Sequence, residues 1–252
     1  MTESKLTSEF GFSRDEDVNE RRANYFRSGA GEDIDKIRSL MRFMGRQDVA
    51  KFCVYHNIFN MTSNVTGSIV ECGVYQGNSL MTWANLSAAL EPYNYNCKII
   101  GLDTFSGYPN ISEQDITNAK SSEQKKIGGW YSNSFEDLNE SISIFDLDRP
   151  LNQIPKVELV KGDITETAPQ YIEKNPHLLV RVLSITTNIY EPIKSSIKAF
   201  LPRMPKGSVL IIDSLNSNLY PGASLALIEE LDLAHLKFET PSYYCNLNYC
   251  VM

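Results

Sequence analysis

Short apolar runs alternate with segments of helical periodicity from residue 68 to residue 233. Short runs of this kind, closing on a glycine or an acid, are typical of strands buried on both faces. Five strand–helix alternations predict a parallel, doubly wound sheet. The strands are expected at 68–74, 98–103, 157–161, within 178–189 and at 208–213, and the helices at 79–90, 135–145, 165–174, 192–201 and 222–233.

The N-terminal part of the chain departs from this alternation. Residues 1–30 are charged and polar, which indicates a loosely ordered arm. From Ile34 to Phe59 the apolar residues recur at steps of three and four, and Gly45 interrupts them, so this stretch predicts two helices.

Two further segments also break the pattern. The polar stretch 106–155 is too long for an ordinary connection between elements. The last residues, 236–240 and 243–251, read as two strands joined at Pro241, which predicts an antiparallel hairpin.

Composition and charge exclude several classes of partner. The chain has 252 residues, of which 42% are apolar, enough for one sizeable core, and its net charge is −7. A net negative charge disfavours non-specific binding to the phosphate backbone of nucleic acids, so we expect no nucleic-acid partner. No stretch approaches the roughly 20 apolar residues that span a bilayer, and the polar N-terminus lacks an apolar signal region. The five cysteines have no metal-like spacing and read as free thiols, so a cytoplasmic location without a membrane partner is expected.

An acid and two glycines stand at the first strand–helix junction. Glu71, Gly73 and Gly77 bracket a turn at which glycines let the backbone approach a ligand closely. Their spacing differs from the GxGxxG cradle for a pyrophosphate, and an acid before the first glycine suits a cationic or hydroxyl-bearing ligand. Asp103 ends the next strand, where an acid accepts hydrogen bonds from ribose hydroxyls. The pattern predicts a nucleoside site; a tight turn beside a solvated acid is the alternative.

The segments around these residues resemble the TylF/MycF (macrocin O-methyltransferase) family of S-adenosylmethionine-dependent sugar O-methyltransferases. The resemblance is carried by 69–79, 101–109, 159–167, 190–192 and the Pro221-Gly222 turn, in this order along the chain. It implies an α/β, Rossmann-like class I methyltransferase fold, with a central, mostly parallel sheet, helices on both faces and a C-terminal antiparallel hairpin.

The resemblance also implies how the chain is organised. Residues 1–60 would be an N-terminal arm and helices that form a lid or a dimer contact. Residues 61–252 would form the S-adenosylmethionine-binding domain, with an insertion at about 106–155. That insertion carries Trp130 and Tyr131, which either cover the substrate or pack a surface loop. A homodimer is expected from the family alone.

The resemblance assigns residues to the cofactor S-adenosylmethionine. Two assignments have structural alternatives, because Asp163 could simply cap the helix that begins near Thr165 and Phe105 could be ordinary core. The implied cofactor-binding residues are Glu71, Gly73, Val74, Tyr75, Gly77, Ser79, Asp103, Thr104, Phe105, Ser106, Gly107, Asp163, Ile164 and Thr186.

The metal site implied by the family is depleted in this chain. Family members carry an Asp-x-Asp after the fourth strand and a pair of aspartates after the fifth, which together hold a divalent ion, usually Mg²⁺. Here Thr186 and Asn188 replace the first pair, the second reads Asp213-Ser214, and Ser184 stands where a His is common. Hard cations require anionic oxygens, so we expect a weak Mg²⁺ site at Asp213 or none.

The reaction expected from these motifs is methylation of a hydroxyl on a sugar or glycosylated small molecule. Asp213 is the best candidate for the catalytic acid–base group, followed by Asn188 and Tyr190. The missing acids leave an alternative open, namely a catalytically reduced relative that binds the cofactor or a partner. A nucleotide-sugar enzyme is disfavoured, because the glycine spacing provides no phosphate cradle.

Overall fold

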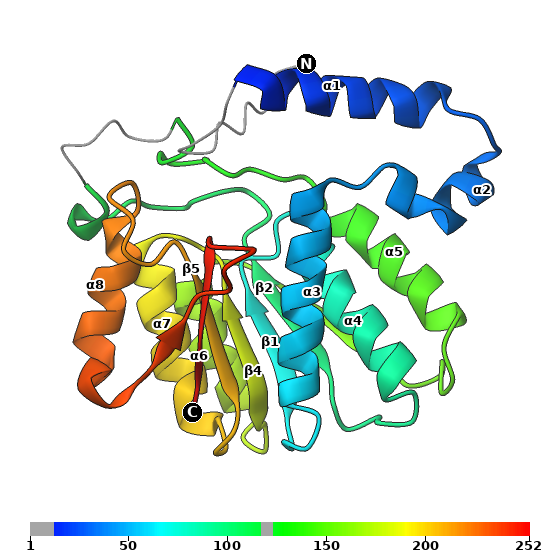
Figure 1. The fold of residues 1–252 in the computed structure, drawn as a ribbon. Helices are drawn as coiled ribbons and strands as arrows, with labels where there is room; N and C mark the ends of the chain where they lie inside the picture. The colour runs from blue at the N-terminus through cyan, green and yellow to red at the C-terminus, as the bar shows by residue number, and fades with distance from the viewer. Residues whose placement is uncertain (1–12, 117–122) are drawn as a thin grey trace. The chain divides into compact units, whose positions relative to one another are not determined.

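The computed structural model describes residues 13–116 and 123–252, which fall into two compact units that divide between Ala50 and Lys51. The second unit is built on a seven-stranded sheet in the order β3-β2-β1-β4-β5-β7-β6 (Figure 1). Strands β1 to β5 are parallel, and β7 pairs antiparallel with both β5 and β6. The strands are β1 Ser68–Cys72, β2 Ile99–Asp103, β3 Val157–Lys161, β4 Val180–Ile185, β5 Val209–Asp213, β6 Phe238–Glu239 and β7 Leu247–Val251.

Helices cover both faces of this sheet (Figure 1), which confirms the predicted fold class. Alternate strand residues point to opposite faces. Ile69 thus packs with α3, α4 and α5, while Val70 packs with α6, α7 and α8. The helices are α1 Ser13–Ser28, α2 Asp33–Arg38, α3 Arg46–Met61, α4 Asn78–Leu90, α5 Phe135–Leu147, α6 Ile164–Lys174, α7 Tyr190–Phe200 and α8 Pro221–Glu230.

The predicted loosely ordered arm is wrong for residues 13–28, which form helix α1. Its local sequence is polar, but the rings of Tyr25 and Phe26 lie 5.3 and 5.1 Å from the ring of Phe43. The Arg42 guanidinium also donates to the Tyr25 hydroxyl. These contacts join residues far apart in sequence, so local periodicity could not reveal the helix. Residues 1–12 of the predicted arm lie outside the described residues.

The two helices expected between Ile34 and Phe59 are present with a short addition. Helix α2 is followed by a 3-10 turn at Leu40–Arg42, and α3 begins directly after Gly45.

The long insertion is only partly helical. It contains a 3-10 turn at Glu113–Asp115 and helix α5, which matches the helix expected at 135–145. Backbone hydrogen bonds join Tyr108 to both Gly128 and Gly129, so the two ends of the irregular part run side by side. Residues 117–122 of the insertion lie outside the described part.

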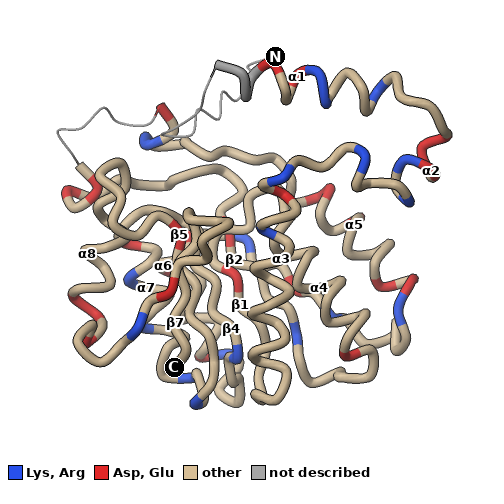
Figure 2. Tube along the Cα trace, viewed as in Figure 1, with Lys and Arg blue, Asp and Glu red and all other residues tan. Residues whose placement is uncertain are grey.

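Charged residues are spread over the molecule rather than gathered on one element. Figure 2 shows Lys and Arg interspersed with Asp and Glu along the chain. Within the described residues, no helix combines the length and apolar character needed to cross a membrane.

Candidate active site

The turn after β1 and the acid that ends β2 are in direct contact. The Asp103 carboxylate accepts a 2.8 Å hydrogen bond from the Tyr75 amide and a 2.7 Å bond from the Phe105 amide. Each of its oxygens therefore has one backbone donor and keeps a lone pair for a further donor. Parallel strands bring their carboxyl ends to one edge of the sheet, and ligands of open α/β sheets bind at that edge.

The backbone at this edge is held in an unusual conformation. Tyr75 and Phe105 both have a φ of 53°, in the left-handed region that bulky residues rarely adopt. Gly77 has a φ of 80°, and a Cβ at this position would lie 2.2 Å from Leu138. Strained residues of this kind persist only where the surroundings fix them, and they cluster at binding sites.

The neighbouring residues of the two loops are tied to each other. Thr104 donates to the Gly107 carbonyl and accepts a hydrogen bond from the Ser106 amide. Val74 is buried in the core, and the Ser79 hydroxyl accepts a 3.2 Å hydrogen bond from the buried Tyr55.

Glu71 is a buried carboxyl group without a conventional partner. Only 1% of the residue is exposed, and neither carboxylate oxygen has a hydrogen-bond partner among the described residues. Burial raises the pKa of Glu71 to about 8, and the Lys51 ammonium is the strongest opposing influence. The Trp83 indole also lowers this pKa, although it lies outside hydrogen-bonding geometry. Glu71 is thus an unsatisfied acceptor inside the protein, which native structures seldom leave without a ligand or water.

Asp213 stands at the same edge, at the end of β5. The residue is partly exposed, but its Oδ1 is shielded from solvent and has no partner in the described chain. Burial raises the pKa of Asp213 to about 6, and Lys51 again opposes the shift. A carboxyl group with such a pKa is ionised at neutral pH and still a usable proton acceptor.

The residues that replace the family's metal ligands bond to the protein instead. The Ser214 hydroxyl donates to the Asn188 amide oxygen at 2.9 Å. The Thr186 hydroxyl donates to the Gly73 carbonyl at 2.6 Å, so Thr186 joins β4 to the turn after β1. No group of three or more His, Cys, Asp or Glu residues able to hold a metal ion occurs in the described part of the chain.

Three cofactor assignments coincide with structural roles. The Asp163 carboxylate accepts hydrogen bonds from the amide and the hydroxyl of Thr165, and so caps α6. Phe105 is buried and lies edge-on to Phe135, with ring centroids 5.1 Å apart. Ile164 is also core, in the cluster on the opposite face of the sheet.

The Tyr190 hydroxyl bonds to side chains of helices α7 and α8. The Tyr190 hydroxyl bonds to Glu229 on α8 and accepts a 2.6 Å hydrogen bond from Lys194 on α7. A hydroxyl held in this ion pair is a poor general base, so we leave Tyr190 out of the proposed catalytic group.

Asp115 is a buried residue that sequence reasoning missed. Its carboxylate accepts hydrogen bonds from the Tyr190 amide at 3.0 Å and the Ser112 hydroxyl at 2.7 Å. A Cβ on Gly222 would lie 1.9 Å from Asp115, which explains the glycine in the Pro221-Gly222 turn. In the sequence, Asp115 is one acid within the polar insertion, and no motif or spacing distinguishes it from the other acids there.

The insertion also reaches the turn after β1. The hydroxyls of Ser132 and Ser134 both donate to the Tyr75 carbonyl. The Trp130 ring lies edge-on to the Tyr75 ring at 5.5 Å, and its indole donates to the Tyr220 hydroxyl. The insertion thus packs against the turn after β1, and the lid itself stays a prediction.

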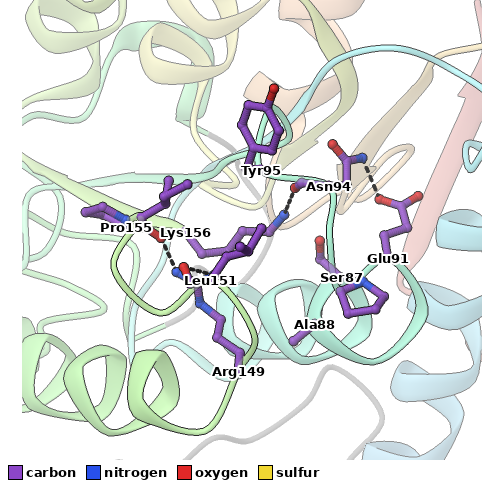
Figure 3. A pocket seen from close by; sticks show the side chains of 11 residues that line it. Ser87, Ala88, Glu91, Asn94, Tyr95, Arg149, Leu151, Pro155 and Lys156 are labelled. Atoms are coloured by element: carbon purple, nitrogen blue, oxygen red, sulfur yellow. Dashed lines mark hydrogen bonds between the residues drawn. The ribbon is translucent and has the colours of Figure 1, made fainter.

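A separate cavity lies near the amino ends of β2 and β3, whereas the candidate site lies at the carboxyl ends of the strands (Figure 3). Its volume is about 10 Å³, which is room for about one water molecule. The Lys156 ammonium there donates to the Asn94 carbonyl at 2.7 Å. This cavity is too small for a nucleoside.

Comparison with known proteins identifies the family. Residues 6–226 match the family described as Macrocin-O-methyltransferase (TylF). The chain belongs to this TylF family. The match confirms the resemblance carried by the motifs and makes the chain an S-adenosylmethionine-dependent methyltransferase. The comparison with curated proteins returns no match.

Solved structures share the TylF fold of this chain. The calicheamicin methyltransferase CalS11 has a TM-score of 0.91 and 24% identity, and the match covers 96% of this chain and 93% of CalS11. Apo CalS11, described as TDP-rhamnose 3'-O-methyltransferase, gives a TM-score of 0.82 and 24% identity over 96% of this chain and 95% of that one. The O-methyltransferase NovP has a TM-score of 0.61 and 17% identity, and the match covers 80% of this chain and 78% of NovP. At these identities, the similarity establishes the fold alone.

Proposed function

We propose that this TylF-family chain methylates a hydroxyl of a sugar or a glycosylated small molecule, with no tightly bound divalent metal. The observation that carries the proposal is the contact of Asp103 with the turn 73–77 beside the unsatisfied Glu71 carboxylate. The similarly folded CalS11 is described as a methyltransferase of TDP-rhamnose, which supports a sugar acceptor. No observation favours the catalytically reduced alternative.

Asp103 and Glu71 are the proposed anchors of the cofactor. Each Asp103 oxygen accepts one hydrogen bond from a backbone amide, of Tyr75 or of Phe105, and this fixes the carboxylate in place. Each oxygen keeps a lone pair that suits one of the two ribose hydroxyls. Glu71 has two free oxygens in a buried position, which suit the cationic end of the same ligand. Val74, Ser79 and the loop 104–107 would shape the walls between these anchors.

Asp213 is the proposed acceptor of the proton from the sugar hydroxyl. When bound, S-adenosylmethionine supplies a methyl group whose bond to sulfur breaks as its bond to the acceptor oxygen forms. The Asp213 carboxylate takes the hydroxyl proton, and its raised pKa of about 6 makes it more basic than a solvated aspartate. Asn188, held by Ser214, is placed beside this edge and would help to orient the acceptor.

Calorimetric titration with S-adenosylhomocysteine tests the cofactor site. Saturable binding to the wild-type protein is expected, and no heat at high micromolar protein would refute the proposal. Asp103→Asn should weaken binding about ten- to a hundredfold, because a hydrogen bond to a charged group contributes about 1.5–3 kcal/mol. Asp232→Asn, in a side chain that is 72% exposed, is the matched control and should bind normally.

Transfer of labelled methyl groups to a pool of nucleotide sugars and glycosides tests the reaction. Asp213→Asn should lower turnover about a hundred- to ten-thousandfold, which is the usual contribution of a general base. Addition of EDTA should leave the wild-type rate unchanged. Loss of activity with EDTA, restored by Mg²⁺, would contradict the metal-free site.

A further inference from the structure

The divalent metal implied by the TylF family does not fit the residues of this chain. Of the four positions that would supply aspartates, three are Thr186, Asn188 and Ser214, and their polar groups already bond within the protein. Asp213 alone supplies an anionic oxygen, whereas Mg²⁺ and Ca²⁺ prefer several. The acceptor end of the site therefore needs another source of positive charge.

Two carboxyl groups at this end have buried oxygens without a hydrogen-bond partner among the described residues. Glu71 on β1 and Asp213 on β5 point to the sheet face that α3 and α4 cover, because their strand neighbours Ile69 and Ile211 pack there. Both Glu71 oxygens and Asp213 Oδ1 lack hydrogen bonds within the described chain. Glu71 keeps its proton in the ligand-free protein up to about pH 8. When Glu71 and Asp213 are both ionised they repel each other in this region, and a shared cation would offset that repulsion.

Lys51 lies on the helix that covers this face. It precedes Tyr55 by one turn of α3, so the two side chains share a side of the helix, and its ammonium lies 5.6 Å from the Tyr55 ring centroid. Tyr55 is buried and donates to Ser79 at the start of α4, which fixes this side of α3 against the candidate site.

The Lys51 ammonium is the cation that acts on both acids. It lowers the pKa of Glu71 and the pKa of Asp213, in each case as the main influence against burial. No ion pair within 4.0 Å is found for Lys51 among the described residues, and a lysine ammonium sits on a flexible four-carbon stem.

We propose that Lys51 is a positioning residue that supplies the positive charge at the acceptor end of the site, in place of a divalent metal. Its ammonium offsets one of the two negative charges that ionised Glu71 and Asp213 would carry, which leaves a single net negative charge to face the cationic cofactor. The inference rests on the proposed function, since it requires the cofactor to bind at this edge.

The test compares two ligands that differ in charge where the methyl group is transferred. S-adenosylhomocysteine is neutral at its sulfur, whereas sinefungin carries an ammonium near the position of the transferred methyl. Both dissociation constants are measured by calorimetry for the wild-type protein, Lys51→Met and Lys51→Arg. Lys206→Met is the matched control, because it removes the same charge before the opposite end of β5.

In Lys51→Met, affinity for sinefungin relative to S-adenosylhomocysteine should rise about tenfold, as expected when one unit charge leaves a partly buried site. Lys51→Arg and Lys206→Met should keep the wild-type ratio. A purely structural role would weaken both ligands together and leave the ratio unchanged, which would overturn the inference. Lys51→Gln provides the same comparison if circular dichroism shows that Lys51→Met is unfolded.

The two proposals can fail separately. If the wild-type protein binds neither ligand, the proposed function falls, and the role of Lys51 falls with it. If both ligands bind and the ratio does not respond to Lys51→Met or Lys51→Gln, the cofactor site stands and Lys51 is not its cation.

Discussion

At the scale of single residues, the candidate site is defined by carboxylates in three different environments. Asp103 is held by two backbone amides, Asp213 is partly exposed at a strand end, and Glu71 is buried without a normal hydrogen bond. The surroundings of a carboxyl group thus decide whether it suits hydrogen bonding to a ligand, proton transfer or binding of a cationic group.

The raised pKa of Glu71 predicts how the stability of the ligand-free protein depends on pH. The folded protein keeps the Glu71 proton up to about pH 8, whereas the unfolded chain loses it near 4.5. The folded state therefore binds more protons between these values, and the free energy of unfolding falls as pH rises, by on the order of 1 kcal/mol per pH unit. Urea denaturation at pH 6, 7 and 8 should show this fall, and Glu71→Gln should remove it.

The chosen pH window separates Glu71 from Asp213. The pKa of Asp213 shifts from 3.8 to about 6, so its contribution lies below this window. An equal slope in the wild-type protein and in Glu71→Gln would show that another group is responsible.

Sequence reasoning located some of these residues better than others. Asp103 was predictable, because the end of an apolar run fixes where an acid stands relative to the sheet. Lys51 and Asp115 were not, because their importance comes from packing of α3 and of the insertion against residues far away in sequence. Asp163 was ambiguous beforehand, and its hydrogen bonds to Thr165 show the capping role.

At the scale of elements, the insertion is fastened to the start of two helices. Asp115 accepts from the first amide of α7 and lies against Gly222 in the first turn of α8. Lys125 adds a 2.6 Å hydrogen bond to the Leu219 carbonyl, just before α8. The acid at a helix N-terminus also interacts favourably with the helix dipole.

Asp115→Ala should loosen the insertion. The Tyr190 amide would lose its acceptor inside the protein, and an unsatisfied buried donor costs about 1–3 kcal/mol. Hydrogen exchange should show faster exchange at the Tyr190 amide and at residues 106–116. Ser112→Ala removes only the hydroxyl that donates to Asp115 and keeps the amide of residue 112 as a donor, so protection of the Tyr190 amide should survive in that variant.

Strands were easier to predict than helix ends. The expected runs at 98–103, 157–161 and 208–213 match β2, β3 and β5 to within one residue, because buried parallel strands read as continuous apolar segments. Helix α7 begins at Tyr190 rather than Pro192, because the Asp115 side chain satisfies its first amide. Helix α1 escaped prediction altogether, since its packing partner Phe43 lies outside its own sequence.

At the scale of the whole Lys51–Met252 unit, the candidate site and a buried ion pair lie at opposite ends of the strands. The candidate site lies at the carboxyl ends of the strands. Near the amino end of β4, the buried Arg181 makes two hydrogen bonds of 2.7 and 2.9 Å to Glu91, just past the end of α4. The Arg181 guanidinium also lies 4.8 Å from the Phe59 ring centroid.

Arg181→Met should destabilise the protein without changing the site. Removing one partner of a buried ion pair costs about 3–5 kcal/mol, and the free energy of unfolding in urea should fall by this amount. Arg181→Met combined with Glu91→Gln should recover part of the loss, since no unpaired charge remains. The affinity of the folded variant for S-adenosylhomocysteine should equal that of the wild-type protein; a large change would show that the two edges are coupled.

The left-handed backbone at Tyr75 and Phe105 has a consequence for how this protein tolerates mutation. Glycine or asparagine would relax both positions, yet neither residue would keep the ring contacts that Tyr75 makes with Trp130 and Phe105 makes with Phe135. A library selected only for heat resistance should drift toward these small residues, while one selected for turnover should retain the aromatic rings. The disagreement between the two selections would measure how much folding stability the loops give up to hold a ligand.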